Sequence, residues 1–149
     1  MTRLWRKPLF IAIIAVSIGF FITYPLWLED DPYSSKNRND LYQALIERSG
    51  ILNRDLPKLL DMNTRFERAE VVDYGMRYVY SLVNVDRYQH DIAQIQAQVE
   101  PALSDYYCRL DAMKFYRKQA DHFTVRYLDR HGSTLFELRL TPTHCNSFR

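Results

Sequence analysis

The sequence predicts an α+β domain behind a single N-terminal transmembrane helix. The domain is expected to hold a four-stranded antiparallel sheet, made of two hairpins, with helices packed on one face. Two pairs of segments with alternating apolar and polar residues, each pair joined by a short turn, predict the hairpins. An apolar stretch from Leu9 to Leu28 predicts the membrane helix. The expected element order is helix, two strands, one or two helices, and two strands.

The apolar stretch has the length and the flanking charges of a membrane span. Its twenty residues extend about 30 Å as a helix, which is the hydrocarbon thickness of a bilayer. Three cations precede it and three anions follow it: Arg3, Arg6, Lys7, and Glu29, Asp30, Asp31. The positive-inside rule then places the N-terminus in the cytoplasm. The predicted parts are a cytoplasmic N-terminus over 1–8, a transmembrane helix over 9–28, a linker over 29–39 and a periplasmic domain over 40–149.

A cleaved signal peptide is the alternative interpretation of this segment. Ser17 and Gly19 supply the small residues of a cleavage site, but cleavage there would leave an apolar tail from Phe20 onward. Trp5 and Trp27 lie where an interfacial aromatic belt is expected, which favours an uncleaved anchor. Within the span, a stripe of small residues at spacings of three and four is a candidate surface for packing against another helix: Ala12, Ala15 and Gly19.

The charge of the part beyond the span argues against nucleic-acid binding. All eighteen acidic residues lie at or after Glu29, whereas three of the twenty basic residues precede the span. The exported part therefore carries seventeen basic against eighteen acidic residues, a formal charge of −1. Nucleic-acid binding depends on clustered Lys and Arg, so a near-neutral domain of this kind is not expected to bind it.

The two cysteines, Cys108 and Cys145, both lie beyond the predicted span. An even pair in an oxidising compartment forms a disulfide more often than a metal site or a nucleophile. We therefore expect a disulfide between them, tying the last part of the chain to the middle of the domain.

Alternation of residue type defines four strands. The first hairpin is expected from Thr64 to Val72 and from Met76 to Val85. The second is expected from Phe123 to Leu128 and from Phe136 to Leu140, with Gly132 at the left-handed position of its turn. The helices are expected at three places: from a cap at Asp40 to Gly50, from a cap at Asp86 to Tyr106 with a kink or break at Pro101, and from Asp111 to Gln119.

Several short motifs together resemble an uncharacterised family of small exported bacterial proteins. The motifs are Leu56-Pro57, Asp61, Thr64-Arg65, Tyr78-x-Tyr80, Leu82-Val83-Asn84, Cys108, Asp129-x-x-Gly132 and Cys145. The resemblance covers roughly residues 52–145. It implies a bacterial periplasmic setting, agrees with the disulfide and brings no activity with it.

Residue patterns of known catalytic and metal sites are sparse. The four histidines lack metal-ligand spacing and are expected to be exposed to solvent, and we expect no cofactor. Asp61, Thr64 and Arg65 form a more interesting group. A structural role is favoured for it, in which Asp61 caps a turn or pairs with Arg65 at the start of the first strand.

The sequence is rich in tyrosine, and Tyr78, Tyr80 and Tyr127 fall on predicted strands. Such rings can belong to a half-buried core, to a protein interface or to a platform that stacks on sugars, and all three remain open. The leading hypothesis is a non-catalytic protein-interaction or assembly module of the bacterial envelope, anchored in the lipid bilayer of the inner membrane. Its partner would be another envelope protein or a second copy of the chain. A module that binds cell-wall glycan or a small ligand, and an envelope hydrolase, are the alternatives.

Overall fold

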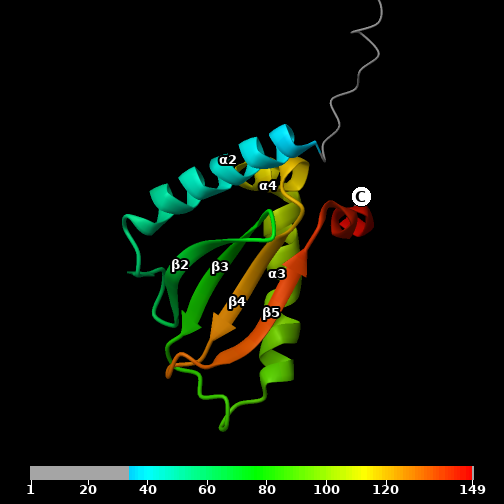
Figure 1. Cartoon of the computed structure of the whole chain (residues 1–149). Coiled ribbons are helices and arrows are strands. Elements are labelled where there is room, and N and C mark those ends of the chain that lie inside the picture. The colour runs from blue at the N-terminus through cyan, green and yellow to red at the C-terminus, as the bar shows by residue number, and fades with distance from the viewer. Residues whose placement is uncertain (1–33, 149) are drawn as a thin grey trace, which may run out of the picture. The chain divides into compact units, whose positions relative to one another are not determined.

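Residues 34–148 are described by the computed structural model (Figure 1). Their elements in chain order are α2 (Ser35–Asn53), β1 (Lys58–Leu59), β2 (Thr64–Val72), β3 (Gly75–Leu82), α3 (Ile92–Arg109), η2 (Asp111–Met113), α4 (Lys114–Gln119), β4 (Phe123–Leu128), β5 (Thr134–Leu140) and η3 (Pro142–Phe148). The predicted membrane span over 9–28, with Ala12, Ala15 and Gly19, lies outside the described residues. Within 34–148, no helix is long and apolar enough to cross a bilayer.

The sheet corrects the predicted fold class. It has five strands in the order β1-β2-β3-β4-β5 instead of four, and it is mixed instead of antiparallel. The two hairpins meet through β3 and β4, which run parallel, with Met76 opposite Phe123 and Ser81 opposite Leu128. Alternation and turn residues define each hairpin but not the direction in which two hairpins meet. That direction depends on the connection over 83–122, which is long enough, with its helices, for the crossover that parallel strands need.

The fifth strand, β1, was missed because it is only two residues long. Lys58 and Leu59 pair with Phe66 and Arg65 of β2. A pair of residues is too short for alternation to be recognised, and Pro57 directly before it argues against a strand interior.

Both predicted hairpins are confirmed. β2 and β3 pair antiparallel from Thr64–Leu82 to Val72–Gly75, and β4 pairs antiparallel with β5. In the second turn, Gly132 has a φ of 83°, the left-handed conformation for which glycine was expected. The first turn obtains its positive φ angles from Asp73 and Tyr74 instead.

The helices differ from the prediction at their ends. α2 begins at Ser35, inside the segment predicted as a linker, and continues past Gly50 to Asn53. α3 begins at Ile92, where the Asp91 side chain accepts a hydrogen bond from the Gln94 backbone N–H, and it continues through Pro101. Asp86, the predicted cap, instead lies before the helix and accepts a hydrogen bond of 2.7 Å from Arg130.

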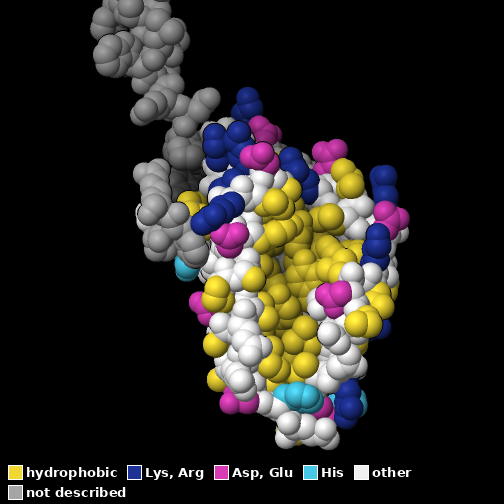
Figure 2. Space-filling model, turned by 180° about the vertical axis from the view of Figure 1, so that it is seen from behind, with side chains coloured by type: hydrophobic (Ala, Val, Ile, Leu, Met, Phe, Trp, Pro, Cys, Tyr) yellow, Lys and Arg dark blue, Asp and Glu magenta, His cyan; other side chains and the backbone are white. Residues whose placement is uncertain are grey.

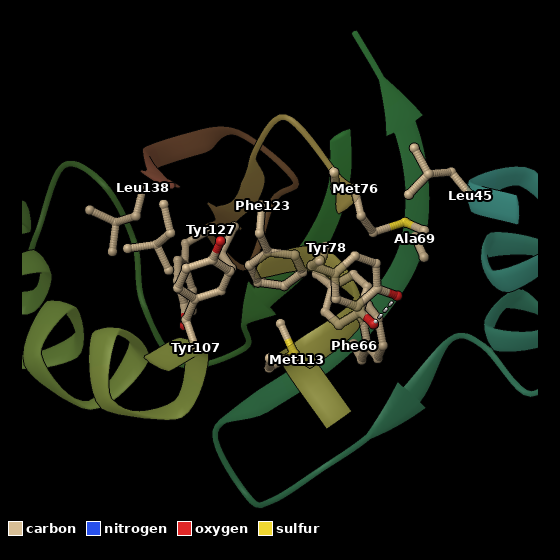
Figure 3. Packing of buried hydrophobic residues seen from close by; sticks show 14 of the residues in the cluster. Leu45, Phe66, Ala69, Met76, Tyr78, Tyr107, Met113, Phe123, Tyr127 and Leu138 are labelled. Carbon is tan, nitrogen blue, oxygen red and sulfur yellow. Dashed lines mark hydrogen bonds between the residues drawn. The ribbon is translucent and has the colours of Figure 1, made fainter. Parts of the chain in front are cut away.

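The core lies between the sheet and the helices. α3 passes behind β4 and β5 in Figure 1. Figure 3 shows Phe123 near the centre of the core, with Leu45 of α2 on one side and Tyr107 of α3 on the other. All three of these side chains are completely buried. The inward residues of the strands therefore face helices, as expected, and the opposite face of the sheet carries charged side chains.

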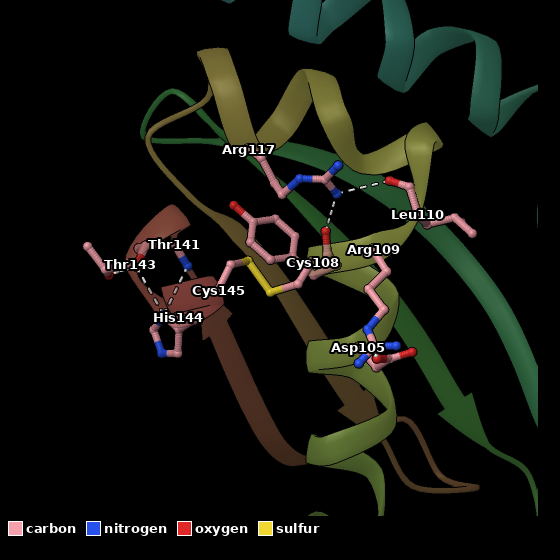
Figure 4. The surroundings of a disulfide bond; sticks show 10 residues. Asp105, Cys108, Arg109, Leu110, Arg117, Thr141, Thr143, His144 and Cys145 are labelled. Atoms are coloured by element: carbon pink, nitrogen blue, oxygen red, sulfur yellow. Dashed lines mark hydrogen bonds and ion pairs between the residues drawn. A yellow bond between two sulfur atoms is a disulfide. The ribbon is translucent and has the colours of Figure 1, made fainter. Parts of the chain in front are cut away.

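The predicted disulfide is confirmed. Cys108 near the end of α3 bonds to Cys145 in η3, across 37 positions of sequence (Figure 4). It joins the helical layer to the segment that follows the last strand.

Candidate partner-binding groove

An apolar groove lies on the helix-bearing side of the sheet, with a volume of about 480 Å³. Figure 2 shows hydrophobic side chains gathered in a broad band on this side of the molecule. The groove is lined by residues of α2, β2, β3, α3, η2 and α4, and by one residue that follows β1. These residues are Arg48, Ile51, Leu52, Leu60, Phe66, Tyr78, Tyr80, Tyr106, Ala112, Met113 and Tyr116.

Aromatic rings of β2, β3 and α4 contribute to the lining. The Phe66 ring centroid lies 4.9 Å from that of Tyr78 and 4.7 Å from that of Tyr80. The hydroxyls of Tyr78 and Tyr116 lie 3.3 Å apart and form a hydrogen bond. Burial is the largest cause that raises the pKa of both Tyr78 and Tyr80 above the ordinary range. These rings therefore stay uncharged even well above physiological pH.

Two polar side chains of α2 fix one wall of the groove to the sheet. The Ser49 hydroxyl donates to the Ala69 carbonyl at 2.8 Å. Asn53 makes two bonds to the same residue, because its amide nitrogen donates to the Ala69 carbonyl and its oxygen accepts from the Ala69 N–H, each at 2.8 Å. These bonds attach the end of α2 to β2, so the wall is formed without a ligand.

The other wall is held by contacts at the end of α3. Arg117 donates to the Tyr107 carbonyl and, at 2.9 Å, to the Leu110 carbonyl, as Figure 4 shows. Cationic groups at a helix C-terminus stabilise it, because the last carbonyls have no partner within the helix. Together with the disulfide at Cys108, Arg117 fixes the part of α3 that carries Tyr106.

The rim of the groove exposes apolar side chains and one cation. Leu60 is 53% exposed and Ile51, on the α2 side, is 54% exposed. The guanidinium carbon of Arg48 lies 3.9 Å from the centroid of the Phe115 ring. Among residues 34–148, no carboxylate forms a salt bridge with Arg48. The rim therefore offers a hydrophobic surface beside an unneutralised positive charge.

The three tyrosines proposed as an interaction surface do not lie together on an open face. Tyr78 and Tyr80 line the groove, whereas the ring of Tyr127 packs on Phe136 with centroids 4.9 Å apart. Tyr78 and Tyr127 are buried, and burial raises the pKa of Tyr127 to about 12. An exposed row of rings for stacking on sugars is therefore not formed by these three residues.

Sequence reasoning missed the walls of the groove. Arg48 lies in the helix predicted from Asp40 to Gly50 and Ile51 just after it, whereas Leu60 lies beyond Pro57, which interrupts the periodicity. One signal in the sequence could have indicated an apolar surface here. Large apolar residues are more frequent around Pro57 than a short polar loop requires: Ile51, Leu52, Leu56, Leu59, Leu60 and Met62.

Asp61 has the structural role that the sequence favoured. Its carboxylate accepts hydrogen bonds from the backbone N–H groups of Asn63 at 2.7 Å and Thr64 at 2.8 Å, and so fixes the entry into β2. Arg65 pairs with Glu67 at 2.7 Å and not with Asp61. A polar hollow on the other face of the sheet contains Arg65 and His131 in its lining but not Asp61. This hollow therefore does not bring Asp61 together with Arg65 and a histidine, the arrangement that an envelope hydrolase would favour.

One histidine differs from the expectation that all four are exposed. His122, just before β4, is 3% exposed, and its Nδ1 accepts a hydrogen bond of 3.1 Å from Arg139. Alternation could not predict this, because the residue lies just before the strand. Among residues 34–148, no group of three or more His, Cys, Asp or Glu side chains is arranged to hold a metal ion.

The burial of His122 makes the stability of the domain depend on pH. Desolvation, followed by the positive charge of Arg139, lowers the pKa of His122 below its ordinary value. Below pH 6.5 His122 is protonated more readily in the unfolded chain than in the folded chain. The free energy of unfolding therefore decreases as the pH falls. We expect His122→Gln to flatten the slope of unfolding free energy between pH 5.5 and 7, measured by urea denaturation at about 25 °C. An unchanged slope in His122→Gln would refute the assignment.

Comparison with known proteins finds similarity of structure alone. No family model matches the chain, and no curated protein matches it by sequence. A protein of Pseudomonas aeruginosa assigned as secreted aligns with a TM-score of 0.63 and 11% identity, over 72% of this chain and 95% of its own. The pilotin EpsS of the Vibrio vulnificus type 2 secretion system aligns with a TM-score of 0.62 and 13% identity, over 75% of this chain and 97% of its own.

A third similar structure is the type II secretion system pilotin AspS of Vibrio cholerae, with a TM-score of 0.59, 13% identity, and coverage of 74% of this chain and 97% of its own. The chain has the fold of these proteins. At 11–13% identity the likeness establishes the fold and not the activity. The neighbours agree with the coarse expectation of an exported bacterial protein, whereas the short sequence motifs quoted above are not confirmed by them.

Proposed function

We propose that this protein is a non-catalytic binding module of the bacterial cell envelope and that it holds an apolar segment of another envelope protein in the groove. The observation that carries the proposal is the groove itself, whose walls are fixed by internal bonds while its rim leaves Leu60 half exposed. Exposed apolar surface of this kind is costly in water and marks interaction sites. A partner segment that covers it gains the free energy of removing that surface from water.

The charge at the rim defines the partner segment further. Arg48 is stacked on Phe115, which orients its guanidinium at the edge of the groove. Arginine beside aromatic surface is common at interfaces because it binds carboxylates in a planar, bidentate geometry. The proposed segment therefore carries large apolar side chains for the groove and one acidic side chain for Arg48.

The structural neighbours support an assembly role. Two of them are pilotins of type II secretion systems and belong to envelope machinery. A binding function in this chain agrees with their fold. The location that we propose is the periplasmic side of the inner membrane. It rests on the charges and the apolar stretch of residues 1–31.

Leu60→Asp tests the groove, and Leu59→Asp is its matched control. The two leucines are neighbours with similar exposure, 53% and 57%, but only Leu60 lines the groove. Burying an unpaired carboxylate against an apolar partner costs several kcal/mol, so we expect Leu60→Asp to lower partner recovery at least about tenfold. The measurement is affinity purification of the full chain from membranes in mild detergent, followed by quantitative mass spectrometry.

Wild type and Leu59→Asp should recover the same envelope proteins, and both variants should unfold within about 0.5 kcal/mol of wild type because both positions are on the surface. Recovery of the same proteins by Leu60→Asp, or no protein above background with wild type, would contradict the proposal.

A further inference from the structure

The face of the sheet opposite the groove carries rows of charged side chains. Residues that alternate with the core residues of β2, β3, β4 and β5 point to this face. Arg77 on β3 lies 3.4 Å from Glu70 on β2 and 3.4 Å from Glu137 on β5. The charged side chains of this face are Arg65, Glu67, Arg68, Glu70, Arg77, Arg126, Glu137 and Arg139.

Three of these arginines are held through the same atom. The Nε of Arg65 donates to Glu67 at 2.7 Å, the Nε of Arg68 donates to Glu70 at 2.6 Å, and the Nε of Arg126 donates to Glu137 at 2.7 Å. Within residues 34–148, the terminal amino groups of these three side chains donate no hydrogen bond. We call Arg65, Arg68 and Arg126 the arginine face.

The anchoring prepares the arginine face to bind carboxylates. A guanidinium that is fixed at Nε still has its two terminal nitrogens for an incoming oxygen pair. Arg65 and Arg68 remain 46% and 48% exposed, so a ligand can reach these nitrogens. Fixing a long side chain before binding also lowers the entropy that binding costs. A polar hollow of about 310 Å³ adjoins them, and its lining includes Arg65, Arg68, Arg130 and His131.

The neighbouring glutamates indicate which kind of anion fits. Three glutamates lie among the five arginines of this face, so its net charge is small. The arginines would attract a densely charged surface, such as a bilayer of acidic lipids, but the glutamate carboxylates would repel it. Separate acidic side chains, spaced along a protein segment, can each meet an arginine and avoid the glutamates.

We propose that the arginine face is a second docking surface, which binds a protein segment carrying separated Asp or Glu side chains. It lies on the opposite side of the sheet from the apolar groove. The domain can then contact two protein segments at once, one through apolar contacts and one through charge-assisted hydrogen bonds. This inference does not depend on the groove being occupied.

Two synthetic peptides of about twelve residues test the arginine face. One carries glutamate at alternate positions and the other carries glutamine there. Binding of each peptide to the full chain in detergent is followed by fluorescence anisotropy at about 0.05 M salt, where charge interactions are least screened. We expect the glutamate peptide to bind about tenfold more tightly than the glutamine peptide, because charge-assisted bonds are about twice as strong as neutral ones.

The Arg65→Lys/Arg68→Lys/Arg126→Lys variant separates a built site from a merely basic surface. Lysine keeps each charge but has no Nε anchor and no planar pair of donors, so we expect affinity to fall about fivefold or more. The matched control is Arg109→Lys, which changes an exposed arginine on α3 and should leave affinity unchanged. Leu60→Asp, which disables the groove, should also leave affinity unchanged.

Three results would overturn the proposal. If the triple lysine variant binds as wild type does, only net charge is recognised. If Leu60→Asp weakens binding, the peptide occupies the groove. If vesicles of phosphatidylglycerol bind to wild type and the glutamate peptide does not, the face recognises phosphate surfaces instead of protein. The first and third results leave the proposed groove function intact, so the two proposals can fail separately.

Discussion

The Cys108→Ser/Cys145→Ser protein unfolds with a free energy about 4 kcal/mol below that of wild type. The disulfide spans 37 positions, and the chain-entropy relation gives this value for a closed loop of that length. The loss is large because a domain of this size has a total stability of only about 5–15 kcal/mol. Urea denaturation followed by circular dichroism measures it, and wild type treated with a thiol reductant should match the variant.

The groove gives this prediction a functional consequence. Cys108 lies at the end of α3, two residues after Tyr106, which forms part of the groove lining. Loss of the bond should therefore lower partner recovery as well as stability. A double-serine protein that unfolds within about 1 kcal/mol of wild type would show that Arg117 and the core hold this wall without the disulfide.

Phe123→Ala is expected to lower the free energy of unfolding by about 3–5 kcal/mol, the usual cost of removing a completely buried phenylalanine. The Phe123 ring is fully buried, and its centroid lies 4.9 Å from Tyr78, 5.4 Å from Tyr116 and 5.9 Å from Tyr107. The substitution thus removes a contact between β4 and each of β3, α4 and α3. The same denaturation experiment measures the loss.

Tyr88→Ala is the matched control for this substitution, because Tyr88 is an exposed aromatic residue. It should unfold within about 0.5 kcal/mol of wild type. A loss of less than about 1 kcal/mol in Phe123→Ala would mean that the surrounding rings collapse into the space, and the ring would then not be central to the core.

Local features of the fold were predictable from sequence, whereas features that depend on distant residues were not. The strand from Thr64 to Val72 and the turn glycine Gly132 follow from alternation and from backbone conformation. The parallel pairing of β3 and β4 depends on how the helices of the connection pack, and no residue pattern within either strand records it. The predicted start of α3 was wrong because aspartate is a suitable cap residue at both position 86 and position 91. Only the folded chain shows that Asp91 caps the helix and that Asp86 accepts a hydrogen bond from Arg130.

The candidate site was predictable only in part for the same reason. A protein interface was one of three interpretations that the sequence left open for Tyr78 and Tyr80, and both of these residues line the groove. Arg48 and Leu60 join them from the two sides of Pro57, a juxtaposition that exists only after α2 has been attached to β2 by Asn53. The burial of Tyr127 could not be read from its strand, since alternation gives the face of a residue but not what covers that face.

The parallel junction has a consequence for the order in which the domain can be completed during synthesis. Met76 finds its partner Phe123 only after the forty-six residues between them have been made. Until then the first hairpin presents the bare edge of β3, with unpaired amides and apolar side chains such as Val79, and such an edge invites pairing with other chains. The second hairpin closes this edge, and Cys145, which follows it directly, then meets Cys108. The growing chain is thus most prone to aggregation just before its second hairpin emerges, and the disulfide can close only after that interval has ended.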